Sequence, residues 1–335
     1  MTPIWSIHKA IDELPCTATM RKVLHVGPAN TPGGMGRVIQ ILSASPPEGW
    51  STETLDSHST GNVFSKLIAW NKAKKFINKN AHKYDIIHFH SAAHFSFRRK
   101  VSLLKIAEKK GIVTVFHIHS GAFKEDNYKN LPLKVLTKTN VVTLSETWMK
   151  RYLKIMGSST AIINPVDPTI TPGHNRVPGQ FLLLGRPDPV KGHMFAINLI
   201  SKLNSMGKEC TLFATGIKEK MAFTQSLGWV DEEEKKRLLQ TSEALLVPSE
   251  YEGQPLVILE ALAANCPVVA SSNIPDLANC VNVAEFDNQV DWIRAIDEMN
   301  SEGLLEAVEA HRIENISARW GEFYESIIDS KASTE

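Results

Sequence analysis

Short apolar runs alternate with longer helical stretches along the chain, and this alternation constrains the fold more than any other feature. The first four runs, RKVLHVG, YDIIHFH, GIVTVFHIH and NVVTLS, cover residues 21–27, 84–90, 111–119 and 140–145. Lysine-bearing stretches with helical character, such as 65–80 and 99–111, separate them. Strands that alternate with helices are typical of parallel, doubly wound sheets. The sequence therefore predicts an α/β protein.

The alternation breaks once and then restarts. The break covers residues 163–179, which are rich in proline, glycine and polar residues, as an interdomain linker is. Apolar runs resume after it, at 180–186, 209–216, 242–249 and 266–272. A chain of 335 residues that is 43% hydrophobic can bury two ordinary cores. We predict two stacked α/β domains, over residues 20–165 and 166–310, after an N-terminal extension over 1–19.

Charge is distributed unevenly between the two halves, although the net charge is only +1. Residues 1–170 hold 23 of the 37 Lys and Arg residues and 11 of the 36 Asp and Glu residues, a net charge of +12, which leaves −11 for the rest. Opposite signs suggest two bodies with different partners. The basic half could bind nucleic acid or an anionic membrane surface. The alternative is that the charge difference has no function. Nucleic acid is disfavoured because no recognised binding module appears and the basic residues are spread over several elements.

The sequence also indicates a compartment. No apolar run is long enough to span a bilayer. Residues 1–19 contain Asp12 and Glu13 and lack the continuous apolar region of a secretory signal. The four cysteines are scattered without a paired spacing, at Cys16, Cys210, Cys266 and Cys280. We expect a cytoplasmic protein with reduced cysteines.

A glycine-rich segment, GPANTPGGMG at residues 27–36, lies between a predicted strand and a predicted helix. Backbone amides in such a turn can approach phosphate oxygens, and the helix dipole favours an anion there. The segment is neither a G-x-G-x-x-G fingerprint nor a P-loop. A tight turn that needs glycine for its geometry explains it equally well.

A second segment, GRPDPVKG at residues 185–192, directly follows a predicted strand. Arg186 and Lys191 would then lie at the carboxyl end of a parallel strand, where open α/β sheets bind ligands. An Arg that binds two oxygens at once and a Lys that acts as a point charge suit a diphosphate. The alternative is a loop with ordinary surface cations.

The third segment, PSEYEGQPLVILEALAANCPVV, covers residues 248–269 and is the most specific. Glu252 follows an apolar strand, and Glu260 stands eight positions later inside a helix whose first residue is predicted to be Pro255. The amides of Leu256 and Val257 then lack intrahelical partners and can bind an anion. The two glutamates could instead simply answer the helix dipole.

In PSEYEGQPLVILEAL the chain resembles the retaining GT-B glycosyltransferases that carry an E-x7-E signature (glycosyl transferases group 1, family 4). GRPDPVKG is similar to that family's Gly-Arg…Lys-Gly element, and TPGGMGRV to its Gly-Gly loop. NPVD at 164–167 looks like the family's linker, and residues 227–249 like the stretch before the signature. The elements follow in family order from about residue 20 to 290. The resemblance implies a GT-B fold: two Rossmann-like doubly wound domains facing a central cleft, with a helix over about 311–335 packing back on the first, acceptor-side domain.

The resemblance also implies roles for individual residues. Glu252 would hold the donor sugar's hydroxyls and Glu260 the ribose, while Arg186 and Lys191 would bind the diphosphate leaving group. His119 would approach the sugar or its phosphate. The remaining donor-binding positions, which include the loop that flanks the nucleobase, are Gly33, Gly34, Gly185, Trp229, Val230, Gly253, Gln254, Leu256 and Val257.

The implied activity is retaining transfer of a sugar, hexosyl in type, from a UDP- or GDP-linked donor to a glycan or lipid-linked acceptor, in cell-surface polysaccharide or glycolipid synthesis. Breaking the glycosyl–phosphate bond leaves negative charge that Arg186, Lys191 and amides would stabilise, so neither a metal nor a cofactor is expected. The chain departs from the family at Asn265 and at NIPDLANC (273–280). A nucleotide-sugar epimerase or hydrolase on the same fold, or a catalytically silent donor-binding subunit, remain the alternatives.

Several histidine and tryptophan side chains have more than one interpretation. His88 and His90, like His117 and His119, share one strand face by their spacing and could bind a metal. Without a neighbouring carboxylate or cysteine in a ligand pattern, we expect strand-end histidines that line a polar cleft. Trp148 and Trp320 are expected to be packing residues.

The basic segment FSFRRKVSLLKIAEKKG, at residues 95–111, adds Phe95 and Phe97 to six cations. On a helix, Val101 and Leu104 share a face with Lys105, so basic groups would flank an apolar stripe. We predict salt-sensitive association of the first domain with the inner face of an anionic membrane. The alternative is that these lysines only solvate the outer face of a core helix.

Overall fold

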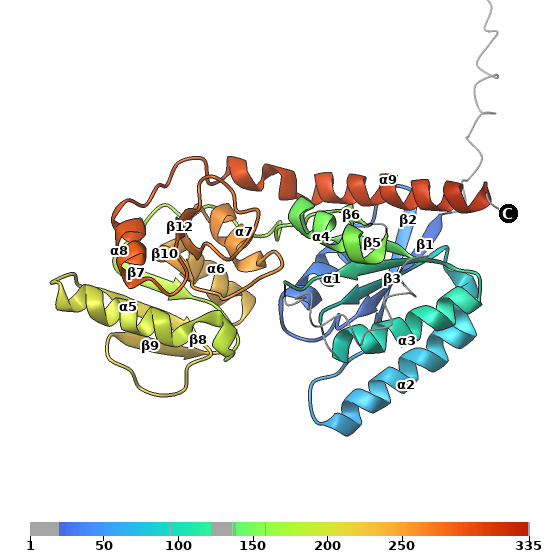
Figure 1. The fold of residues 1–335 in the computed structure, drawn as a ribbon, viewed down its shortest axis with the longest axis horizontal. Coiled ribbons are helices and arrows are strands. Elements are labelled where there is room, and N and C mark those ends of the chain that lie inside the picture. The colour runs from blue at the N-terminus through green and yellow to red at the C-terminus, as the bar shows by residue number, and fades with distance from the viewer. Residues whose placement is uncertain (1–19, 94, 122–135, 137–138, 158, 334–335) are drawn as a thin grey trace, which may run out of the picture.

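The computed structural model describes residues 20–93, 95–121, 136, 139–157 and 159–333. They form two α/β bodies, each built around a parallel sheet of six strands, with a long C-terminal helix lying along the first body (Figure 1). The predicted α/β class with two doubly wound sheets is confirmed. Among the described residues, no helix is long and apolar enough to cross a bilayer.

The first sheet has the strand order β2-β1-β3-β4-β5-β6. Its strands are β1 (Arg21–Gly27), β2 (Trp50–Asp56), β3 (Ile86–Ser91), β4 (Val113–Ile118), β5 (Asn140–Thr143) and β6 (Thr160–Ala161). The helices that connect them are α1 (Gly34–Ala44), α2 (Val63–Asn80), the 3-10 turn η1 (Ala81–Lys83), α3 (Phe95–Lys109) and α4 (Glu146–Met156). The chain leaves β1 on one side toward β2 and returns to β3 on the other. The strand order therefore reverses at β1 and β3, where such sheets place their ligands.

Side chains alternate between the two faces of this sheet. Leu24, Phe89 and Phe116 are buried on the face covered by α2 and α3. Val23 and Val115 are buried on the opposite face, under α1 and the C-terminal helix α9 (Ile313–Ala332). Strands covered on both faces read as continuous apolar runs, which is why they were recognisable in the sequence.

The second sheet has a different order, β12-β11-β10-β7-β8-β9. Its strands are β7 (Val177–Leu183), β8 (Thr211–Thr215), β9 (Thr224–Gly228), β10 (Ser242–Val247), β11 (Val268–Ser271) and β12 (Asn282–Ala284). Its helices are η4 (Pro189–Lys191), α5 (His193–Ser205), α6 (Glu232–Thr241), α7 (Leu256–Ala263), α8 (Gln289–Asp297) and η5 (Glu306–His311). This is the order of the dinucleotide-binding sheets, in which the reversal falls between the first and fourth strands, β7 and β10.

Helix α9 covers the first sheet rather than the second, although it follows the second in the chain (Figure 1). Trp320 and Tyr324 are buried there together with Trp50 of β2. The Trp50 Nε1 donates to Glu325 Oε1 at 2.9 Å, and Arg319 donates to the carbonyl of Ala161 at 2.9 Å. The chain therefore crosses between the bodies twice, once before β7 and once before α9.

Candidate functional site

The carboxyl ends of β4 and β10 bring the two bodies into contact. A Cβ on Gly253 would lie 2.9 Å from the carbonyl oxygen of His119, and a Cβ on Gly121 would clash with the backbone of Glu252. Trp148 Nε1 of α4 donates to the carbonyl of Gly253 at 2.9 Å. Glycine is required at both positions because the two loops touch through their backbones. Trp148 is a buried packing residue, as predicted.

Two predicted residues from opposite sides of the β7–β10 reversal form an ion pair. Lys191 Nζ lies 2.5 Å from Glu252 Oε1, and Ser249 Oγ donates to the same oxygen at 2.9 Å. Lys191 ends the turn η4 after β7, whereas Glu252 lies in the loop after β10. Both side chains are mostly shielded, with 24% and 15% of their area exposed. The structure thus joins the second and third sequence segments at one point.

Arg186 lies beside this pair in the chain, but its side chain is exposed. No hydrogen bond or ion pair of its guanidinium occurs among the residues that the structure describes. Its backbone carbonyl accepts from Asp188 at 2.7 Å. Gly185 is held instead through its backbone, by two hydrogen bonds with Thr215 Oγ1 at 2.8 and 2.9 Å. The strand end is therefore fixed while the Arg186 guanidinium can reach an incoming anion.

The glycine-rich loop of the first body faces the start of α7. Gly33 has a φ of 133°, a left-handed conformation that favours glycine. A Cβ on Gly34 would meet the side chain of Leu256 at 3.8 Å. Helix α7 begins at Leu256 with Pro255 as its N-cap, one residue later than predicted. Leu256 and Val257 remain in the first turn, where amides lack intrahelical partners. The start of α1 thus lies next to the side chain of Leu256 at the start of α7.

Glu260 is buried in α7 and pairs with a lysine that the sequence did not single out. Lys235 Nζ of α6 lies 2.7 Å from Glu260 Oε1 and 2.7 Å from Glu232 Oε2. Burial raises the pKa of Glu260, and the Lys235 ammonium counteracts this effect. Burial opposes protonation of Lys235, but its two glutamate partners raise its pKa. Glu260 therefore interacts with a specific lysine and not only with the dipole of α7.

A second unpredicted ion pair joins α1 to the linker. Arg37 binds the fully buried carboxylate of Asp167, which also accepts from Thr169 Oγ1 at 2.7 Å. Burial alone would raise the pKa of Asp167, but its bonds with Arg37 and Thr169 lower it. Arg37 Nε also lies 4.0 Å from Glu232. Charged side chains thus connect α1, through the linker, with α6 and α7. The only sign of these contacts in the sequence was a single acidic residue in the proline-rich linker.

The remaining donor-binding positions are arranged differently. Gln254 holds the linker, because its Oε1 accepts from the Asn164 amide at 2.7 Å. Trp229 follows β9, the edge strand of the second sheet, and is 66% exposed. Val230 packs partly against the core. Within the described residues, Trp229 makes no hydrogen bond with Lys191 or Glu252.

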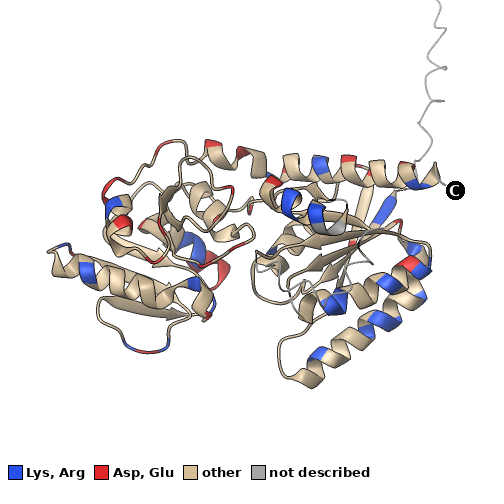
Figure 2. Ribbon diagram, viewed as in Figure 1, with Lys and Arg blue, Asp and Glu red and all other residues tan. Residues whose placement is uncertain are grey.

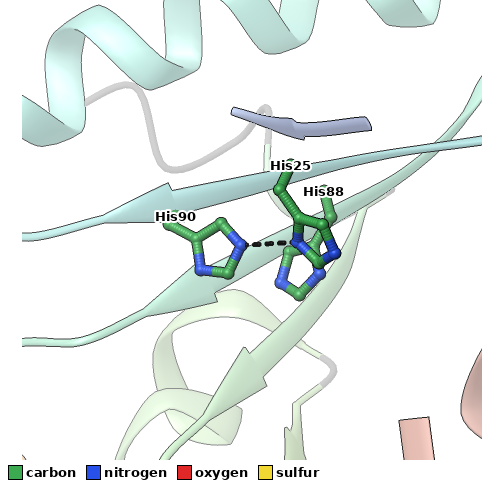
Figure 3. A group of neighbouring side chains, drawn as sticks. All are labelled: His25, His88 and His90. Carbon is green, nitrogen blue, oxygen red and sulfur yellow. Dashed lines mark hydrogen bonds between the residues drawn. The ribbon is translucent and has the colours of Figure 1, made fainter. Parts of the chain in front are cut away.

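Five histidines gather on the face of the first sheet that α9 covers, and Figure 3 draws three of them, from β1 and β3. They are His25, His88, His90, His117 and His119. The register places His25 opposite His88 and His90 opposite His117. His90 bonds through its two nitrogens to His25 and His119, both at 3.0 Å. Two overlapping groups of three, one of which is the group in Figure 3, are close enough to hold a metal ion.

The expectation that His88, His90 and His117 line a polar cleft is wrong. All three are at most 1% exposed, and the rings of His88 and His117 lie against Trp320, whose predicted packing role is confirmed. Because side chains alternate between the two faces of the sheet, these rings lie in the layer between the sheet and α9. Burial lowers the pKa of His119 to about 3 and the pKa values of the other three well below the ordinary value, which favours the neutral form of each ring.

Helix α3 also differs from the expectation for segment 95–111. Phe97, Val101 and Leu104 are buried in the core of the first body, so the predicted apolar stripe faces inward. Exposed apolar side chains occur instead on the first two turns of α2 and at the start of α3: Val63, Phe64, Leu67, Ile68 and Phe95. Figure 2 shows Lys and Arg along both helices.

Comparisons with known proteins agree with this architecture. Residues 178–308 match the profile of the family described as Glycosyl transferases group 1. The chain is 27% identical over 305 residues to the amylovoran biosynthesis glycosyltransferase AmsK of Erwinia amylovora, covering 81% of this chain and 73% of that protein.

Among solved structures, the fold resembles a sucrose-phosphate synthase from Thermosynechococcus elongatus, with a TM-score of 0.69 at 15% identity over 92% of this chain and 100% of the other. It also resembles the apo form of the lipopolysaccharide outer core galactosyltransferase WaaB, with a TM-score of 0.63 at 15% identity over 92% and 99% of the two chains. The predicted GT-B fold is confirmed by these likenesses.

Proposed function

We propose, from the match of residues 178–308 to the Glycosyl transferases group 1 profile, that the chain moves a sugar from a UDP- or GDP-linked donor to a glycan or lipid-linked acceptor with retention of configuration. The observation that carries the proposal is the Lys191–Glu252 pair, which lies at the reversal of the second sheet in the loops that follow β7 and β10. The names of AmsK and WaaB, in amylovoran and lipopolysaccharide synthesis, support a role in cell-surface polysaccharide or glycolipid synthesis.

In the structure, the acidic groups that we assign to donor binding each form an ion pair with a lysine. When a donor binds, sugar hydroxyls would take the place of Lys191 on the Glu252 carboxylate. Lys191 and the exposed Arg186 would then turn to the diphosphate, with the amides at the starts of α1 and α7. Fixed cations and amides that meet the charge of a departing diphosphate lower the barrier for its departure. Glu260, which its partner Lys235 keeps in place, would receive the ribose hydroxyls.

The chemical step follows from this arrangement. The bond between the anomeric carbon and the diphosphate oxygen breaks, and its electron pair leaves with the diphosphate. The acceptor oxygen bonds to the same face of that carbon, and its proton passes to the leaving diphosphate. Retention results because attack and departure use one face. A retaining hydrolase would need two carboxylates about 5 Å apart across the anomeric carbon, a role that Glu252 bound to Lys191 and Glu260 bound to Lys235 do not suit.

A panel of nucleotide sugars tests the proposal. Release of nucleoside diphosphate is measured with and without glycan or lipid-linked acceptors, each in buffer and in excess chelator. We expect release that depends on an acceptor and persists in chelator. Release without any acceptor would indicate a hydrolase, interconversion without release an epimerase, and binding without either a silent subunit. Activity lost in chelator and restored by zinc would assign the histidine cluster to metal binding.

We also propose that the protein works at the cytoplasmic face of a membrane. The apolar side chains Val63, Phe64, Leu67 and Ile68 of α2 and Phe95 of α3 are exposed next to lysines of the same helices. Apolar area combined with cations is the composition that binds anionic bilayers. This surface, which we call the α2 patch, replaces the buried stripe of α3 in the original prediction.

A further inference from the structure

Polar side chains without partners gather at the carboxyl end of the first sheet. His58 and Ser59 follow β2, and Arg99 and Lys100 lie in the second turn of α3, which follows β3. Among the described residues, His58 Nδ1, Ser59 Oγ and Arg99 Nε are all buried without a hydrogen-bond partner. Lys100 is 1% exposed and, within the described part of the chain, makes no hydrogen bond or ion pair. Four such groups in one place point to a ligand that would satisfy them.

The charges of these groups have the same sign. His58 is acted on by Arg99, Lys66 and Lys100, and burial followed by these cations lowers its pKa to about 4. Burial and then Arg99 lower the pKa of Lys100 to about 7. Among the described acids, Asp56 acts on both, and its two oxygens already accept from Asn30 at 3.1 and 2.5 Å. A buried ammonium without a partner is costly, so a fold that keeps one indicates a functional site.

The location of the group relates it to the other body. Lys100 acts electrostatically on His119, whose backbone adjoins Gly253 and thus the loop of Glu252. The first turn of α3 contains no acidic residue, and its amides add to the positive potential. The group therefore lies on the first body's side of the contact between the bodies, across from the donor-binding ion pair.

We propose that His58, Arg99 and Lys100 form a binding site for a phosphoryl group carried by the acceptor. This inference rests on the proposed function, because it assigns the acceptor's chemistry to the side opposite the donor. A phosphate ester or diphosphate offers several oxygens, which a guanidinium, an ammonium and an imidazole can share with the hydroxyl of Ser59. A lipid diphosphate that carries a glycan and a soluble phosphorylated glycan share this chemistry.

Binding of inorganic pyrophosphate tests the site without turnover. The titration uses the full chain with Arg186→Ala and Lys191→Ala, which together remove both cations proposed to bind the donor's diphosphate, and follows heat of binding and melting temperature. Lys100→Met in this background is expected to weaken binding on the order of tenfold or more, because a charge-assisted hydrogen bond is lost. Arg99→Gln should act in the same direction. Lys105→Gln, an exposed position on the same helix, is the matched control and should bind like the background.

A second readout separates binding from a structural role. Lys100→Met removes an unpaired buried charge, so without pyrophosphate the variant should melt at or above the temperature of its background. Pyrophosphate should then fail to raise that temperature. A variant that melts lower but binds pyrophosphate normally would overturn the site.

Farnesyl diphosphate, titrated in parallel, distinguishes the two sources of the phosphoryl group. Tighter binding than pyrophosphate, lost in Lys100→Met, supports a lipid-linked acceptor, whereas equal binding lost in the same variant supports a soluble phosphorylated one. Binding of both probes that is unchanged in Lys100→Met and Arg99→Gln would overturn the proposal. Because donor turnover is not measured, such a failure leaves the assignment of Lys191 and Glu252 intact, and a failure of that assignment would leave pyrophosphate binding intact.

Discussion

The two bodies differ in whether their buried cations have acidic partners. In the second body, Lys191 pairs with Glu252 and Lys235 with Glu260, so each cation has its acid in place. In the described part of the first body, Lys100 has no such partner, and the histidines under α9 bond to one another. From this difference we infer that a ligand would exchange partners with existing ion pairs on the second body, whereas on the first body it would supply a partner to Lys100.

The largest expected effect is acid sensitivity of the first body. Burial lowers the pKa of His25 to about 4 and of His119 to about 3, with His88, His90 and His117 also lowered, while an unfolded histidine titrates near about 6.5. Below that pH the unfolded chain binds more protons, so stability falls as pH falls. Each histidine costs about 1.4 kcal/mol per pH unit, and five cost several.

Hydrogen exchange between pH 7 and 5 measures this effect body by body. The first body should open before the second, where burial lowers the pKa of His193 and His311 only. His88→Gln should flatten the dependence by about one proton, and the exposed His82→Gln should not change it. A second body that opens first, or a stability that does not vary with pH, would contradict the comparison.

The next effect concerns the cations of the second body. Arg186→Ala and Lys191→Ala should each lower turnover on the order of 10²–10³-fold, because each removes a group that stabilises the leaving diphosphate. Lys202→Ala, an exposed lysine of α5, is the control. Near-normal kcat in either variant would remove that residue from the mechanism.

Smaller effects are expected when the paired acids are neutralised. Glu260→Gln leaves Lys235 with Glu232 alone and should cost about 1–3 kcal/mol in the free energy of unfolding, together with weaker donor binding. Glu252→Gln should weaken donor binding or turnover with the fold intact. Glu233→Gln, whose carboxylate is 85% exposed, should change neither. If donor kinetics are the same in both test variants, the exchange of partners is ruled out.

The smallest effect concerns the α2 patch. Each basic residue near an anionic bilayer contributes about 1 kcal/mol, and salt screens it. Sedimentation with vesicles should therefore increase with anionic lipid and decrease with salt. Phe64→Ser with Ile68→Ser should weaken it, while the same pair of changes at the exposed Met194 and Met206 of the second body should not. Binding that is indifferent to lipid charge would favour a soluble acceptor.

The sequence was most informative about candidate site residues that directly follow the end of a strand. Lys191 and Glu252 were recognisable from their positions after apolar runs, because parallel strands carry such residues to one edge. Their ion pair was not predictable, since 61 residues separate them. Lys235 and Arg37 were missed for the same reason: each is one of many basic residues on a helix until the fold brings an acid to it.

In the first body, the predictions for the histidines and for α3 were partly wrong. The histidine spacing correctly placed the rings on one sheet face, but period two does not tell which layer covers that face. Helix α9, which comes from the far end of the chain, buries them. Likewise, Val101 and Leu104 would form an apolar stripe on a membrane-facing helix and on a core helix. Only the packing of α3 against the sheet shows that this stripe faces the core.

The most direct test of the central claim is the configuration of the product. Proton NMR of the reaction, with the donor that the panel identifies, reports the anomeric configuration of the first product before it can equilibrate. The account predicts the configuration of the donor, formed only when an acceptor is present and reduced on the order of 10²–10³-fold in Lys191→Ala. A product of inverted configuration, or retention at an undiminished rate in Lys191→Ala, would contradict it.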